Sequence, residues 1–133
     1  MSVNRSYKTY EDQAITTASP GQLTLMLYDG CLKFIRLAKA ALAEQDYEQK
    51  NVQLVKAQNI IRELMLTLDQ EVQIAGGMMQ MYDYIHRCLV EANVKSDADS
   101  LNEAEQYVTE FRDAWKEVLV AHRKQQFKQN GQV

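Results

Sequence analysis

The chain has 133 residues, of which 46% are hydrophobic and 25% are charged. It is therefore long enough to bury one domain-sized core and too apolar to stay disordered. The formal net charge is −3 at pH 7 and the basic residues form no basic face, which argues against a nucleic-acid-binding protein. Five glycines and one proline leave room for long helices and little room for turn-rich β structure.

The sequence also suggests where the protein works. The segment Met1 to Arg5 lacks the apolar core of a secretory signal. No apolar run approaches the roughly 20 residues that a membrane span needs. We therefore expect a cytoplasmic protein with no membrane span, in which Cys31 and Cys88 are reduced residues of the core.

The N-terminal part divides at Ser19. Residues 1–18 are polar and lack a sustained periodicity, so we expect a mobile arm that carries Tyr7 and Tyr10. Ser19 can cap a helix, Pro20 suits the first helical position, and Gln22 would complete a capping box. These signals predict a first helix from Pro20 to about Ala43.

The first helix has apolar residues on two sides, which is more than the single apolar face that a bundle helix needs. Two interpretations stay open: the helix is contacted on both sides within its own bundle, or part of the second side is a groove for a partner helix. One stripe comprises Leu23, Leu27, Cys31, Phe34, Ala38 and Ala41, and the other comprises Leu25, Tyr28, Leu32, Ile35 and Leu42.

Three further helices are predicted at about 46–70, 78–94 and 99–125. The paired glycines Gly76 and Gly77 indicate a turn between the second and the third. A capping box from Ser100 to Glu103 could begin the fourth, although Asp97 or Asp99 could cap it instead. The predicted stripes are Tyr47, Leu54, Ala57, Ile61, Leu64 and Leu68; then Met78, Met81, Tyr82, Ile85, Leu89 and Ala92; then Leu101, Ala104, Val108, Phe111, Trp115, Val118 and Leu119.

Short connections between long helices favour an all-α, antiparallel up-down four-helix bundle over residues 19–125. The stripes do not follow heptads, which argues against a long coiled-coil dimer. Residues 126–133 are predicted to be a frayed tail.

Motifs for catalysis are missing from the sequence. A di-iron bundle needs two Glu-x-x-His motifs, and only one related motif, Asp83 to His86, occurs. Gly76 and Gly77 alone do not make a phosphate-binding loop, and neither cysteine has an activating neighbour in the sequence. We therefore expect no enzyme, no cofactor and no metal, but a domain that binds another protein. The alternatives are a histidine phosphotransfer bundle using His86 and a structural dimer subunit.

Six segments, taken in order and spacing, resemble the FliS family of flagellar secretion chaperones along nearly the whole chain. They are Tyr7-x-x-Tyr10, TTASPGQLTLMLYDG at 16–30, KAQNIIxEL at 56–64, MYDY at 81–84, VEAN at 90–93 and FRDAW at 111–115.

The resemblance implies a cytoplasmic four-helix bundle that binds the disordered C-terminal segment of flagellin in apolar grooves. The family prevents premature polymerisation and delivers its client to the export gate protein FlhA. By resemblance, Tyr7 and Tyr10 are candidates for docking to the gate, and a homodimer is possible when no client is bound. The candidate flagellin-binding residues are Leu23, Leu27, Tyr28, Ala57, Ile60, Ile61, Leu64 and Asn93.

Overall fold

The computed structural model describes residues 19–68 and 73–131, and this part of the chain contains four α-helices and no strand. The helices are α2 (Pro20–Ala43), α3 (Tyr47–Thr67), α4 (Gln73–Lys95) and α5 (Ala98–Gly131). The predicted N-terminal arm, with Tyr7 and Tyr10, lies outside the described residues.

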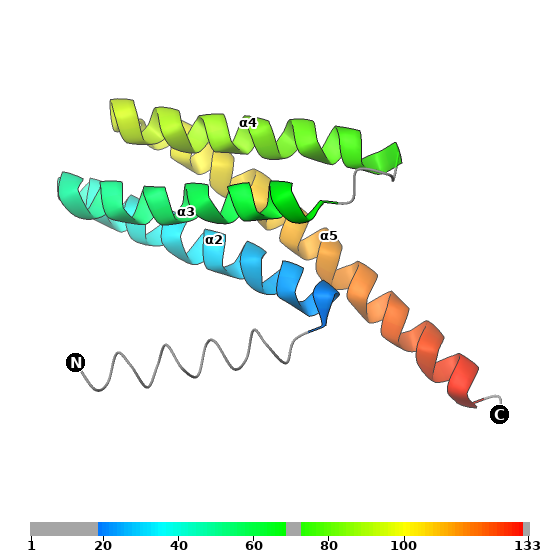
Figure 1. The fold of residues 1–133 in the computed structure, drawn as a ribbon. Coiled ribbons are helices and arrows are strands. Elements are labelled where there is room, and N and C mark those ends of the chain that lie inside the picture. Colours follow the sequence, from blue (N-terminus) through cyan, green and yellow to red (C-terminus); the bar gives the residue numbers. More distant parts are fainter. Residues whose placement is uncertain (1–18, 69–72, 132–133) are drawn as a thin grey trace.

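The four helices form the predicted bundle. Helix α2 packs against α3 and α5, and α4 packs against the same two neighbours, so α2 and α4 are diagonal to each other. Successive helices run in opposite directions, and the C-terminal end of α5 projects beyond the other helices (Figure 1). The long apolar stripes and short connections explain this arrangement, because each helix buries its stripe against two neighbours.

Polar caps fix the beginnings of three helices. The Ser19 hydroxyl accepts a hydrogen bond from the Gln22 backbone N–H, and the Gln22 side chain accepts one from the Ser19 N–H, both at 3.2 Å. The predicted capping box is therefore confirmed. Asp46 caps α3 by accepting from the Gln49 N–H at 3.1 Å. At the start of α5 the cap is Asp97, one of the two predicted alternatives to Ser100.

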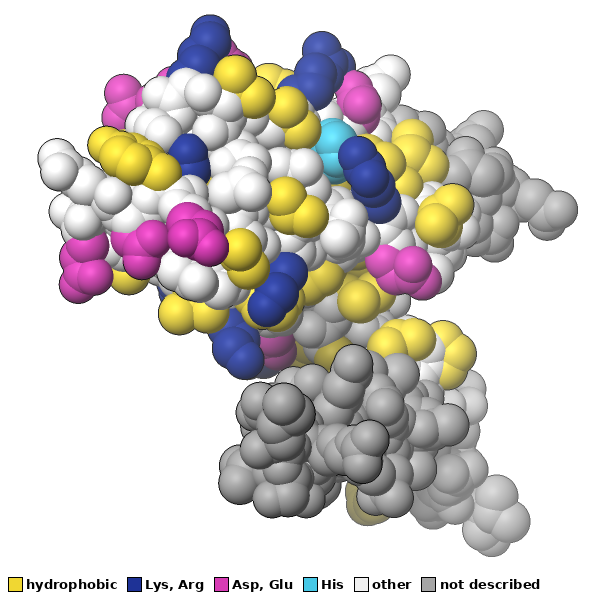
Figure 2. Space-filling model, turned by 60° about the vertical axis from the view of Figure 1, so that its left-hand side comes forward, with side chains coloured by type: hydrophobic (Ala, Val, Ile, Leu, Met, Phe, Trp, Pro, Cys, Tyr) yellow, Lys and Arg dark blue, Asp and Glu magenta, His cyan; other side chains and the backbone are white. Residues whose placement is uncertain are grey.

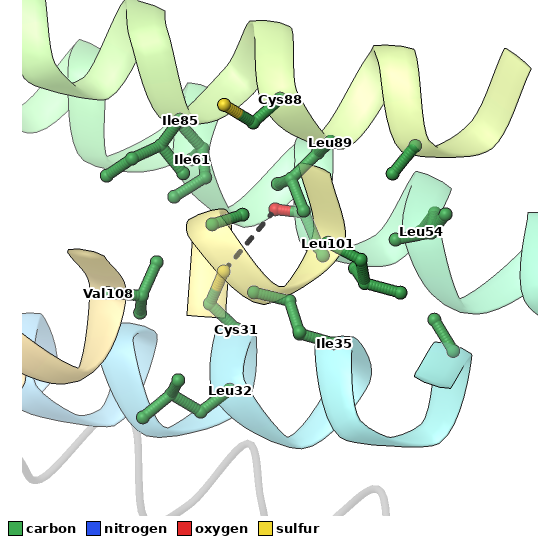
Figure 3. Close-up of a cluster of buried hydrophobic side chains, with 14 of the residues drawn as sticks. Cys31, Leu32, Ile35, Leu54, Ile61, Ile85, Cys88, Leu89, Leu101 and Val108 are labelled. Carbon is green, nitrogen blue, oxygen red and sulfur yellow. Dashed lines mark hydrogen bonds between the residues drawn. The ribbon is translucent and has the colours of Figure 1, made fainter. Parts of the chain in front are cut away.

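The core contains the centre of every predicted stripe. Figure 3 shows residues of all four helices pointing toward a common interior, with the Cys31 sulfur directed at a backbone carbonyl. That carbonyl belongs to Ala57 and lies 3.9 Å from the sulfur. The largest fully buried side chains are Tyr28, Tyr82, Leu32, Ile35, Leu54, Ile61, Ile85, Leu89, Leu101, Val108 and Cys31.

Some predicted boundaries were wrong. Gly76 and Gly77 lie inside α4, because the helix begins at Gln73. Two glycines cost a helix only about 1 kcal/mol each relative to alanine, and the apolar stripe that starts at Met78 packs against the core. Helix α3 ends at Thr67, before the predicted residue 70. Helix α5 passes the predicted end at residue 125 and continues to Gly131, although its last turns are exposed.

Two stripe residues are also on the surface. Tyr47 and Val118 are 53% and 52% exposed, although both were predicted to face inward. Tyr47 is the first residue of α3, and its ring lies beside the Lys50 ammonium group at 5.5 Å. Val118 lines a cleft between α5 and the start of α2, so no neighbouring helix covers its side chain fully.

Candidate protein-binding surfaces

The motifs behind the family resemblance meet inside the bundle. The Tyr28 ring stacks on the Phe111 ring, with centroids 6.3 Å apart and planes 8° apart, and the Tyr82 ring lies 5.8 Å from Phe111. On the surface beside them, Arg112 of α5 and Asp29 of α2 form an ion pair at 3.7 Å. These segments of α2, α4 and α5 therefore hold the helices together, whatever else they contact.

Four of the candidate flagellin-binding residues belong to the core. Tyr28, Ala57, Ile61 and Leu64 are at most 2% exposed, because they lie on the inward stripes of α2 and α3. A partner cannot contact these side chains while the bundle stays closed. They can only support a binding surface from beneath.

Asn93 is occupied by contacts within the bundle. Its side-chain amide donates to the Asn51 side chain at 2.7 Å, and its backbone carbonyl accepts from the Lys50 ammonium at 2.9 Å. Lys50 is itself buried and also donates to the Ser96 hydroxyl at 2.8 Å. A cation at the last turn of α4 is favoured by the helix dipole, so Asn93 and Lys50 join α3 to the end of α4.

The other three candidates, Leu23, Leu27 and Ile60, are half-buried on α2 and α3. The two helices approach closely there, since a Cβ atom added at Gly30 would lie 3.3 Å from the Ile60 Cδ1 atom.

An apolar stripe of α2 continues from this contact out to the surface. Met26 and Leu37 are 38% and 44% exposed, and their spacing puts them on one side of the helix with Leu23, Gly30 and the half-buried Phe34. We call the following set the α2–α3 face: Leu23, Met26, Leu27, Gly30, Lys33, Phe34 and Leu37 of α2, with Lys56 and Ile60 of α3.

Two lysines accompany Phe34 on this face. The Lys33 and Lys56 ammonium groups lie 5.8 and 5.4 Å from the centre of the Phe34 ring. Lys33 belongs to α2 and Lys56 to α3, so one ammonium group from each helix lies near the ring. This cluster could not be predicted from the sequence, because only the packing of α2 against α3 brings Lys56 to Phe34.

A cleft of about 680 Å³ separates the start of α2 from the projecting part of α5. At its base the Trp115 indole N–H donates to the Gly21 carbonyl at 2.8 Å. A Cβ atom at Gly21 would come within 2.7 Å of the Leu119 Cδ2 atom, so a larger residue at this position would require the Leu119 side chain to shift. Pro20, Val118 and His122 also line the cleft.

Beyond the cleft, the last turns of α5 leave Val120 and Phe127 exposed. The face turned toward the viewer in Figure 2 shows smaller groups of hydrophobic side chains separated by charged ones. On this face the exposed apolar surface is therefore divided into small groups.

One ring nitrogen of His86, the phosphotransfer candidate, has a hydrogen-bond partner within the bundle. The Arg62 side chain donates to its Nε2 atom at 3.3 Å. Partial burial and the charge of Arg62 lower the pKa of His86, with Asp83 acting in the opposite direction. Within the described residues, no three His, Cys, Asp or Glu side chains lie close enough together to hold a metal ion.

None of the four described helices has a stretch that is long and apolar enough to span a membrane.

Comparisons with known proteins agree with this architecture. The family described as "Flagellar protein FliS" matches residues 3–122. The "Flagellar secretion chaperone FliS" of Bacillus subtilis (strain 168) is 52% identical over 124 residues, covering 93% of each chain. The protein of the same name from Salmonella typhimurium is 37% identical and covers 80% of this chain and 82% of its own length.

A solved structure described as "Crystal structure of flagellar chaperone from bacteria" shares the fold, with a TM-score of 0.72 at 19% identity. The match covers 88% of this chain and 97% of the solved one. Because the family match and the relatives extend over most of the sequence, this chain belongs to the FliS family of flagellar secretion chaperones.

Proposed function

We propose that this protein binds the disordered C-terminal segment of flagellin in the cytoplasm, prevents its premature polymerisation, and delivers it to the export gate protein FlhA. Membership of a family of secretion chaperones calls for a client protein. The family resemblance supports flagellin as that client and FlhA as the receiving partner.

The observation that carries this proposal is the apolar stripe of the α2–α3 face. Met26 and Leu37 are exposed at two ends of a stripe whose middle, around Phe34 and Ile60, is half-buried. An amphipathic helix binds such a stripe by covering it with its own apolar residues, spaced at three and four positions. Flagellin segments that are disordered alone would gain this helical structure when they bind.

The candidate residues then have two roles. Leu23, Leu27 and Ile60 contact the client, because part of each side chain remains accessible. Tyr28, Ala57, Ile61 and Leu64 keep the bundle in shape below that contact. Asn93 fixes the end of α4 against α3, and any contact with flagellin would use the outer side of its amide.

Residues 1–18 serve as a separate arm in this proposal. Tyr7 and Tyr10 dock to FlhA, while residues 19–125 hold the client. The bundle acts by binding and not by catalysis, and needs no cofactor, metal, nucleic acid or membrane. Without a client, two copies could cover their apolar strips by forming a homodimer.

Calorimetric titration tests the proposed client. The protein is titrated with full-length flagellin and with flagellin that lacks its C-terminal segment. We expect binding only to the full-length form, with a negative heat-capacity change from the burial of apolar surface. Absence of binding to both forms would contradict the proposal.

A further inference from the structure

The basic side chains of α2 have different partners on its two sides. Toward α5, Arg36 and Lys39 pair with Glu105 at 3.6 and 3.1 Å. Toward α3, Lys33 and Lys56 lie over the Phe34 ring, and among the residues that the structure describes neither forms an ion pair with a carboxylate. The α2–α3 face therefore carries two cations without a counter-charge from the described residues.

The Phe34 ring positions both cations. The electron-rich face of an aromatic ring attracts an ammonium group, and here it attracts one from each of two helices. The two ammonium groups lie 5.8 and 5.4 Å from the centre of this one ring, so an anion beside the ring is attracted by both. A carboxylate is the side chain that supplies such an anion and can accept hydrogen bonds from both ammonium groups.

We propose that Lys33 and Lys56 bind an acidic residue of the client helix, an inference that rests on the proposed function. Its carboxylate binds both ammonium groups beside the Phe34 ring, while apolar residues of the same helix cover Met26 and Leu37. The α2–α3 face thus recognises an amphipathic helix with a carboxylate next to its apolar stripe. The apolar contacts provide most of the affinity, and the carboxylate determines the position of the client helix along the stripe.

The probe for this inference is a peptide with the sequence of the flagellin C-terminal segment, together with single-substitution versions in which one Asp or Glu becomes Asn or Gln. Each peptide is titrated into the full-length protein and into its Lys33→Gln/Lys56→Gln double variant, at low and at high salt. Both lysines are exposed, so circular dichroism should show an unchanged fold.

We expect the double variant to bind the unmodified peptide about tenfold more weakly at low salt, and the difference to shrink at high salt. One Asp or Glu substitution should produce the same loss with the wild-type protein and no further loss with the double variant. Two matched controls are Glu63→Gln, which removes an exposed charge of the opposite sign from α3, and Lys124→Gln on the distant end of α5. Neither should weaken binding.

Equal affinity of the double variant and the wild type would overturn the inference. So would equal losses for every acidic residue of the peptide, since that indicates general attraction and no defined position. If the double variant changed only dimer formation, seen by light scattering, or bound more tightly because residues 1–18 no longer competed, the face would have a different occupant. Failure of the wild type to bind any peptide would instead contradict the proposed function.

Discussion

The hydroxyl oxygens of Tyr28 and Tyr82 lie 2.5 Å apart in the interior, and their hydrogen bond joins the diagonal helices α2 and α4. Burial raises the pKa of both phenols, so both stay protonated and one donates to the other. Tyr28→Phe would leave the Tyr82 hydroxyl buried without this partner. We expect a loss of about 1–3 kcal/mol in the free energy of unfolding, measured with urea.

The double variant Tyr28→Phe/Tyr82→Phe provides the control for this pair. Removing both hydroxyls leaves no buried group unpaired, so its loss should be smaller than the sum of the two single losses. Strict additivity would show that the two hydroxyls are not coupled. Flagellin affinity should not change in any of these variants, because both rings are buried.

Ile60 and Leu64 are neighbours on α3 that should respond differently to the same substitution. Leu64 is 2% exposed, so Leu64→Asp buries a carboxylate and should cost more than about 4 kcal/mol, enough to unfold much of the protein. Ile60 is half-buried against Gly30, so Ile60→Asp should keep the helical circular dichroism signal and lose flagellin binding. If Ile60→Asp also unfolds the protein, Ile60 is only a core residue.

The stability of the bundle should depend on the protonation of His86. The pKa of His86 is lowered in the folded protein by burial and by Arg62, whereas in the unfolded chain this pKa is about 6.5. The unfolded state therefore binds more protons just below that pH, and folding stability falls as the pH drops through it. The wild type should lose more unfolding free energy than His86→Gln between pH 7.5 and about 5.5. Identical pH profiles would exclude this contribution.

Tyr10 separates the two proposed partners. Tyr10→Ala should leave flagellin affinity unchanged and weaken binding to FlhA, because in the proposed function the arm docks to the gate while the bundle holds the client. Pull-down of FlhA by the preformed complex with flagellin, alongside calorimetry with flagellin alone, measures both. An equal loss of the two activities would contradict this division, and Tyr47→Ala on the exposed start of α3 is a matched tyrosine control.

The sequence predicted the fold better than the binding surface. Helical periodicity and the Ser19 capping box are local signals, so the bounds of α2 and most core stripes followed from them. The prediction missed the helical glycines of α4 because a pair of glycines is also compatible with a helix that tertiary packing supports. Tyr47 and Val118 continue their stripes, but they lie where the neighbouring helices end.

For the candidate site, motif membership alone did not distinguish contact from support. Ala57, Ile60 and Ile61 occur in one motif, yet only Ile60 is partly accessible. The apolar line from Leu23 through Met26 and Gly30 to Leu37 was not among the two predicted stripes of this helix, although its residues have helical spacing. The Lys56 contact with Phe34 was not predictable, since it depends on how α2 and α3 are aligned.

The reactivity of the two buried cysteines reports on opening of the bundle. Cys31 is fully buried and its pKa is raised to about 12 by burial, while Cys88 is 7% exposed and its pKa is raised mainly for the same reason. A thiol reagent needs a thiolate that it can reach, which the closed helices withhold at both positions. The rate at which the native protein reacts with such a reagent therefore measures how often α2 or α4 moves away from its neighbours, and a client that clamps the helices should slow that reaction.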